Sequence, residues 1–130
     1  MSGEKELAWR WASRERLSEE QWQEVIEALP PSVASRARNG ASTRNFVEAV
    51  LWVADTGASW TSLPSGYGDH RGHYVHFIRW ANSYIWHAVI HRLGTVDIST
   101  RLQSLLHRYE TSKQARDFKA SGNRTPSRGS

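Results

Sequence analysis

The pattern of apolar and polar positions predicts helices along most of the chain. Ser18 and Gln21 have the spacing of a capping box, which marks the start of a first helix. Apolar residues then recur at helical spacing, at Trp22, Val25, Ile26 and Leu29. Pro30-Pro31 is expected to stop this helix. We interpret the small and polar stretch 31–42 as a loop.

Two further helices are predicted in the middle of the chain. Helix 43–56 has an apolar stripe, and Gly57 is placed to end it in a left-handed conformation. Residues 59–64 are long enough for one helical turn, and 65–68 are expected to form a loop. Asp69 is a good N-cap for a helix that runs to about Asn82. The stripe of helix 43–56 consists of Phe46, Val47, Val50, Leu51 and Ala54.

The C-terminal part continues this helical pattern. A helix over 84–93 is expected to end at Gly94, and Ser99 to cap a last helix. The apolar face of that last helix is Leu102, Leu105, Leu106 and Tyr109. No alternating strand pattern stands out, so the sequence predicts an all-α fold, a small helical bundle. Its expected parts are an N-terminal extension 1–16, a helix-turn-helix domain 17–94, a C-terminal helix 95–110 and a disordered basic tail 111–130.

Charge is distributed unevenly along the 130 residues, whose net charge is +4. Residues 1–30 carry a net charge of −3, residues 31–98 of +2 and residues 99–130 of +5. A basic C-terminal third favours an anionic partner, of which nucleic acid is the commonest, although a solubilising tail is the alternative. The absence of Cys excludes disulfides and thiolate metal sites. Without a signal-peptide core or a run of 18 apolar residues, we expect a cytoplasmic protein with no membrane partner.

A helix-turn-helix is predicted from helix 43–56, turn 59–64 and helix 69–82, the last of which would enter the major groove. On the helical wheel, Tyr74, Phe77 and Ala81 share one face, and the opposite face holds Gly72, Val75, His76, Arg79 and Ser83. We therefore expect base or groove contacts from Arg71, His73, His76 and Arg79. Phosphate contacts are expected from the basic tail and from Arg36, Arg38 and Arg44. An ordinary solvated face is the alternative.

Three motifs in order carry a resemblance to a known family. The first is Ser18-Glu19-Glu20-Gln21-Trp22 with Leu29-Pro30-Pro31. The second is Leu51-Trp52-Val53 with Thr56-Gly57-Ala58-Ser59-Trp60 and Leu63-Pro64. The third is Tyr67-Gly68 followed by Tyr74, Phe77, Trp80 and Trp86. With this spacing, residues 17 to about 93 resemble the N-terminal domain of IS5-type insertion-element transposases, especially the IS402-like group.

The resemblance implies a helical, nucleoid-associated domain that binds double-stranded DNA such as the ends of its element. Full-length members continue into an RNase H-like domain, in which two Asp and a Glu bind two metal ions. Residues 94–130 are too few for such a domain, so we expect no catalytic residues, no cofactor and no enzyme activity of this chain alone. It would be a first reading frame, a truncated transposase or a domesticated form. A homodimer or a catalytic-domain partner chain is the expected protein partner.

Other readings of the sequence concern metal binding and protein binding. His87 and His91 have the spacing of a metal pair on a helix, but a third ligand is needed and we expect no metal site. Asp97-Ile98-Ser99-Thr100 resembles the surroundings of the family's first catalytic Asp, but lacks the apolar strand before it.

The alternative function is a protein-interaction module that has lost DNA binding. Residues that depart from the family pattern, His70, Gly72-His73 and Tyr84, motivate it, as do Trp9 and Trp11 in the extension.

Overall fold

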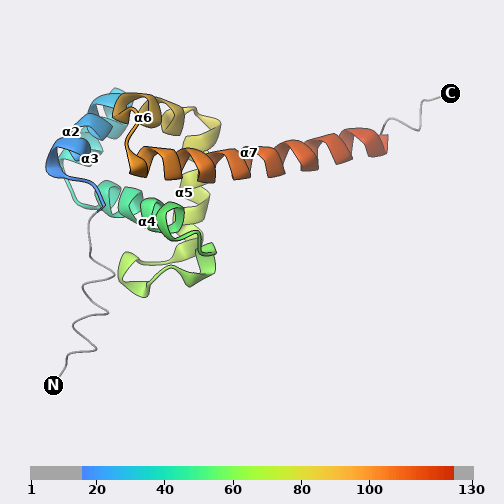
Figure 1. Ribbon diagram of the computed structural model, residues 1–130, viewed down its shortest axis with the longest axis horizontal. Coiled ribbons are helices and arrows are strands. Elements are labelled where there is room, and N and C mark those ends of the chain that lie inside the picture. Colours follow the sequence, from blue (N-terminus) through green and yellow to red (C-terminus); the bar gives the residue numbers. More distant parts are fainter. Residues whose placement is uncertain (1–15, 125–130) are drawn as a thin grey trace, which may run out of the picture.

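The computed structural model describes residues 16–124, and these form helices joined by short connections (Figure 1). The α-helices are α2 (Glu19–Ala28), α3 (Pro31–Arg38), α4 (Ser42–Thr56), α5 (His70–Asn82), α6 (Ile85–Leu93) and α7 (Asp97–Arg124). Two single turns of 3₁₀ helix, η1 (Trp60–Ser62) and η2 (Ser65–Tyr67), lie between α4 and α5. The described residues contain no strand, which confirms the all-α prediction. Trp9 and Trp11 lie outside the described residues.

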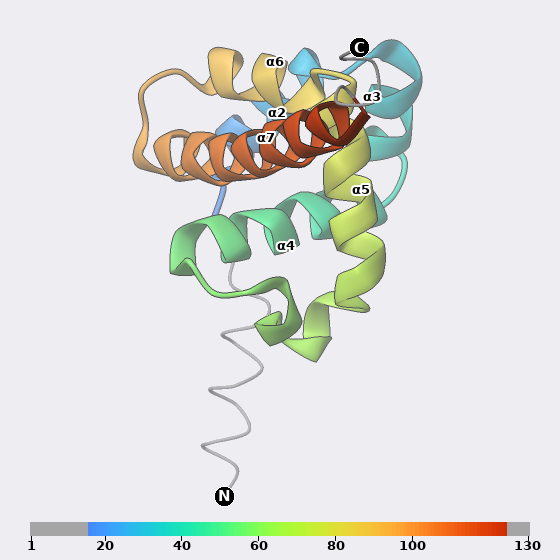
Figure 2. The ribbon, with the colours of Figure 1, turned by 90° about the vertical axis from the view of Figure 1, so that its right-hand side faces the viewer.

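Helix α4 is the centre of the fold. Its residues from Phe46 to Ala54 are all buried, because neighbouring helices cover it on several sides. The docked part of α7 runs along α4, α2 packs against α6, and α5 passes the N-terminal end of α4 (Figure 2). A cluster of aromatic rings fills the junction of α4, α5 and α6, where Trp86 is fully buried and donates its indole N–H to the Phe77 carbonyl at 3.0 Å.

The local signals for helix ends are confirmed. Ser18 and Gln21 form the complete capping box, with each side chain bonded to the other's backbone N–H. The Asp69 carboxylate accepts from the Arg71 N–H and caps α5. Gly57 ends α4 with a φ of 71°, a left-handed conformation that costs a residue without a Cβ little.

The prediction of a loop over 31–42 was wrong for the first eight of these residues. They form α3, because Pro31 stands at the first helical position, where its fixed φ favours a helix and its missing N–H is not needed. Ala34 and Ala37 are buried at helical spacing and allow the backbone to pack closely. The double proline therefore ends one helix and begins the next.

The expected end of the last helix was also wrong. Helix α7 begins at Asp97, so Ser99 is not its cap, and the buried Ser99 hydroxyl instead donates to the Gly94 carbonyl. The helix continues to Arg124, well beyond the expected end near 110. Residues 111–119 are mostly polar, but they contain no Gly or Pro and several good helix formers. The part of the expected tail from 125 to 130 lies outside the described residues.

The connection between α4 and α5 is longer than the turn of a standard helix-turn-helix. It spans residues 57–69, whereas such motifs use a turn of three or four residues. A short Gly-containing turn, 39–41, does occur between α3 and α4. The helix after that turn is the buried α4, however, so its side chains are covered by the bundle. Helix α5, in contrast, has an exposed face.

Candidate nucleic-acid interface

Helix α5 buries one face and exposes a cationic one. Phe77, Trp80 and Ala81 are buried against the bundle. The apolar spacing predicted this for Phe77 and Ala81. Arg71, Val75 and Arg79, four residues apart, form an exposed stripe on the same helix. After the capping Asp69, the helix contains no carboxylate. The exposed stripe can therefore approach an anion without repulsion from its own helix.

His73 and His76 were expected on or beside the solvent face, and the structure places both only partly in contact with solvent. Both rings are half-buried and lie over Phe46 of α4, with the His76 and Phe46 ring centroids 3.7 Å apart and nearly parallel. The Nε2–H of His73 also donates to the Tyr67 carbonyl at 2.7 Å. These histidines join α5 to α4 and to the preceding connection. A helical wheel of α5 could not show this, because it contains no information about Phe46 of α4, which packs against both rings.

The surroundings of His76 also locate α3 relative to α5. Burial lowers the pKa of His76, and the nearby positive charges of Arg79, His73 and Arg36 lower it further. Arg36 belongs to α3 and Arg79 to α5, so both helices bring a guanidinium to the neighbourhood of this ring. Arg38 is exposed at the end of α3. Arg36 and Arg79, from two of the residue groups singled out in the sequence, thus both act electrostatically on His76.

The arginines of the described region fall into two sets. Arg36, Arg38, Arg71 and Arg79 are exposed, and within residues 16–124 none of them has a salt-bridge partner. Others are held by carboxylates: Arg16 and Arg101 by Asp55, Arg44 by Glu19, and Arg92 by Glu24 and Glu27. These four lie on α3 and α5; Arg108 and Arg116 of α7 are also exposed and, within residues 16–124, have no salt-bridge partner.

Arg44, expected among the phosphate contacts, belongs to the paired set. Its guanidinium lies 2.9 Å from the Glu19 carboxylate, and its Cζ is 5.4 Å from the centre of the Trp22 ring. It also donates to the Leu17 carbonyl at 3.4 Å. Hydrogen bonding from Arg44 is the main cause that lowers the pKa of Glu19. Arg44 thereby fastens α2 to α4.

A buried acid, Glu48, was missed by the sequence analysis. It is buried in α4 and accepts the backbone N–H groups of Arg16, at 2.8 Å, and Leu17, at 3.4 Å. The Arg16 side chain meanwhile forms an ion pair with Asp55, at 3.0 Å. No signal in the sequence indicated that Glu48 is buried, because Glu48 is not at a position of the predicted apolar stripe. Glu48 and Asp55 of α4 thus hold the chain that leads into α2, at Arg16 and Leu17, against the central helix.

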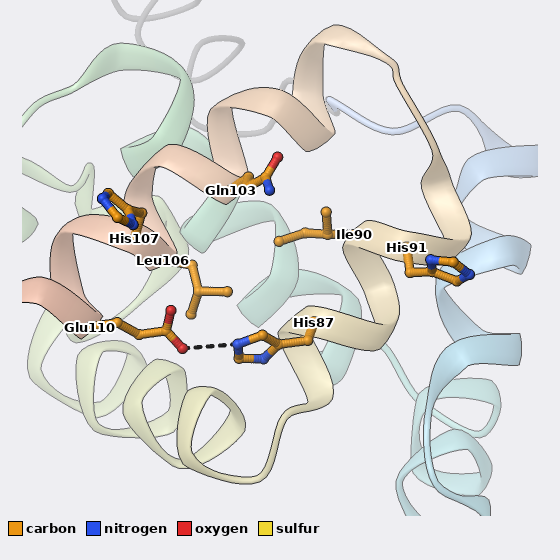
Figure 3. Close-up of a pocket in the computed structure, with 7 residues that line it drawn as sticks. All are labelled: His87, Ile90, His91, Gln103, Leu106, His107 and Glu110. Carbon is orange, nitrogen blue, oxygen red and sulfur yellow. Dashed lines mark hydrogen bonds and ion pairs between the residues drawn. The ribbon is translucent and has the colours of Figure 1, made fainter.

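A hollow between α6 and α7 is lined by His87, His91 and His107 (Figure 3). His87 points toward Glu110 and its Nε2 lies 2.8 Å from the carboxylate, while His91 points away from both. Among residues 16–124, no three His, Cys, Asp or Glu side chains are placed to hold a metal ion. The His87–Glu110 contact joins α6 to α7.

No helix within residues 16–124 combines the length and the apolar character needed to cross a membrane.

Comparisons with known proteins agree with the motifs. Residues 17–90 match the family described as "Putative transposase of IS4/5 family (DUF4096)". An uncharacterized protein, y4sN, of Sinorhizobium fredii (strain NBRC 101917 / NGR234) is 30% identical over 64 residues. This similarity covers 49% of the chain and 51% of y4sN, so the chain spans about half the length of that relative. No solved structure matches. The family match covers more than half of the chain, including α2 to α5 and most of α6, and the chain therefore belongs to this IS4/5 transposase family.

Proposed function

We propose that this protein binds double-stranded DNA as the DNA-binding module of an IS4/5-type transposase, with the ends of its element as the target. The observation that carries the proposal is the separation of arginines into paired and unpaired sets. Structural arginines in the bundle are neutralised by carboxylates, whereas α3 and α5 keep exposed guanidinium groups that have no carboxylate partner within residues 16–124. Membership of a transposase family supports DNA as the anion that completes them.

Helix α5 is the proposed reading helix. An α-helix fits the major groove, and Arg71 and Arg79 lie on one exposed stripe from which guanidinium groups can reach guanine O6 and N7. Val75 lies between them and offers an apolar contact to a thymine methyl group. Arg36 and Arg38 on the neighbouring α3 are assigned to the phosphate backbone, which sets register without reading sequence.

The remaining predicted contacts take other roles in this proposal. His73 and His76 support α5 from behind through Phe46, and Arg44 stabilises the junction of α2 and α4. The arrangement works like a helix-turn-helix, in which one helix reads and others brace it, although the connection before α5 is long. Catalysis is assigned to another part of a transposase, in the same or a second chain.

The test is binding to a fluorescent duplex with the terminal repeats that flank the gene, against a scrambled duplex, at two salt concentrations. Wild-type protein is expected to prefer the repeats and to bind more weakly at the higher salt concentration. Arg79→Ala should remove most of the preference. Arg92→Ala is the matched control, because it removes the same charged group from an arginine that Glu24 and Glu27 hold.

A second candidate is a protein-interaction module, favoured by exposed apolar side chains. Tyr84 is 70% exposed, Val75 48% and Tyr74 37%. No binding of either duplex at low salt, together with a salt-insensitive complex with a catalytic-domain chain, would replace DNA with a protein partner. Equal loss in Arg79→Ala and Arg92→Ala would contradict the assignment of α5 as the reading helix.

A further inference from the structure

Helix α7 consists of two parts with different surroundings. Its first part, from Asp97 to about Glu110, packs on the bundle through Leu102, Leu105 and Leu106, which are all buried. Its second part leaves the body and extends away from it (Figure 1). We call residues 111–124 the arm. Every described side chain of the arm, from Thr111 to Lys119, is exposed.

The arm has the charge of a nucleic-acid-binding helix and lacks the apolar seam of a helix-pairing one. The sequence of the arm contains a single acid, Asp117, and four basic residues: Lys113, Arg116, Lys119 and Arg124. Phe118 is its one large apolar side chain, and a coiled coil needs an apolar residue every three or four positions. Charge complementarity therefore favours a polyanion over a second helix as the partner.

The base of the arm is attached to the end of α5. The Asn82 side-chain oxygen accepts from the Tyr109 hydroxyl at 3.3 Å and from the Lys113 ammonium at 3.2 Å. His87, just beyond the α5–α6 turn, contacts Glu110. These contacts set the direction in which α7 leaves the body. The arm consequently begins beside the C-terminal end of the helix that we assign to the groove (Figure 2).

The length of the arm suits a duplex that lies on α5. At about 1.5 Å per residue, residues 111–124 extend about 21 Å. A major groove is about 12 Å wide, and a phosphate charge occurs about every 1.7 Å along the duplex axis. A helix of this length that begins at the end of α5 can therefore reach the strand bordering the groove.

We propose that the arm is a second DNA contact, in which Lys113, Arg116 and Lys119 bind the phosphate backbone of the duplex read by α5. This inference rests on the proposed function and adds a surface outside the family match, which ends at residue 90. The arm adds affinity that does not depend on sequence, because phosphate contacts carry none of the base information.

The test replaces Lys113, Arg116 and Lys119 with Gln, a good helix former, and measures affinity for both duplexes across a range of salt. The loss of three phosphate contacts should lower the slope of log affinity against log salt by about 2.7. A fourfold rise in salt would then weaken the triple variant about 40-fold less than the wild type. The preference for the repeats should stay, whereas Arg79→Ala should lose it.

Two further measurements separate the arm from net charge and from folding. Arg116→Gln and Arg108→Gln remove the same group from exposed positions of α7, but Arg108 lies on the docked part. We expect the slope to fall more for Arg116→Gln, and amide hydrogen exchange at residues 111–119 of the wild type to slow when the repeats are added. Equal slopes for the wild type and the triple variant, equal effects of the two single variants, or unchanged exchange in the arm would overturn the inference while leaving α5 as the reading helix. A wild type that binds no duplex would remove both proposals.

Discussion

Two regions of this protein use the same residue types for different ends. Around α2, α4 and α6, the charged side chains pair: Glu48 holds the entering backbone, Arg44 meets Glu19, and Arg92 meets Glu24 and Glu27. On α3 and α5, the exposed arginines have no carboxylate partner among the described residues. This difference shows that an arginine's role depends on its surroundings. An arginine paired with a carboxylate stabilises the fold, whereas an exposed arginine without such a partner is a candidate for binding. Substitutions in the two regions should therefore change different measurements.

The largest effect on stability is expected at Glu48. Replacing Glu48 with Ala leaves the backbone N–H groups of Arg16 and Leu17 without their acceptor, so the free energy of unfolding should fall by about 3 kcal/mol. Urea denaturation followed by Trp fluorescence measures this. Glu20→Ala is the control, because Glu20 is exposed in the first turn of α2. A fall as small as that of the control would mean that Glu48 is not the anchor of residues 16 and 17.

The next effect is expected in binding rather than stability. Replacing Arg71 and Arg79 together with Ala should weaken binding to the repeat duplex about 100-fold, from roughly 1–3 kcal/mol for each base contact. Unfolding by urea should change little, since both side chains are exposed and have no salt bridge to another described residue. A double variant that unfolds more easily yet binds as tightly as the wild type would reverse the roles of the two regions.

A smaller effect on stability is expected at Arg44. Its side chain is only 20% exposed and covers Trp22, so Arg44→Ala should lower the free energy of unfolding by about 1 kcal/mol. DNA affinity measured well below the unfolding midpoint should then match that of the wild type. Selective loss of DNA binding in a stable Arg44→Ala protein would return Arg44 to the interface, where the sequence placed it.

The smallest effect is a dependence of stability on pH at His76. Its pKa is lowered in the folded protein, mainly by burial and then by the charges of Arg79, His73 and Arg36. The unfolded chain therefore takes up a proton at His76 first, and this group's contribution to stability is present above pH 6.5 and is lost as the pH falls below it. Unfolding midpoints at pH 7.5 and 5.5 should differ less in His76→Phe than in the wild type. An equal or larger difference in the variant would exclude His76 as a source of the pH dependence.

The sequence predicted the helices wherever a local signal was strong. The capping box at Ser18, the cap at Asp69 and the glycine at the end of α4 were read correctly, because each depends on contacts within a few residues. The errors concerned α3 and the arm. The prediction relied on a periodic pattern of large apolar residues. Helix α3 buries only small side chains, Ala34 and Ala37, and the arm is an exposed polar helix, so neither shows that pattern.

The candidate site could be read from the sequence only in part. Arg71 and Arg79 were found because α5 is a regular helix with a strong cap, and its exposed stripe follows from helical spacing. His76 could not be placed, because its burial depends on Phe46 of another helix, 30 positions earlier in the chain. Arg44 could not be separated from Arg36, because the acid that pairs with Arg44 lies on α2.

By itself, the sequence determined the helical class, most helix ends and the transposase family, since spacing and motifs are properties of the chain order. The tertiary structure decided which cations are neutralised, which histidines are covered and where the last helix leaves the body. These depend on contacts between residues far apart in the chain: Arg44 with Glu19, Arg92 with Glu24, and Lys113 with Asn82. No local pattern encodes such a pair, because only packing of the helices brings its two members within hydrogen-bonding distance.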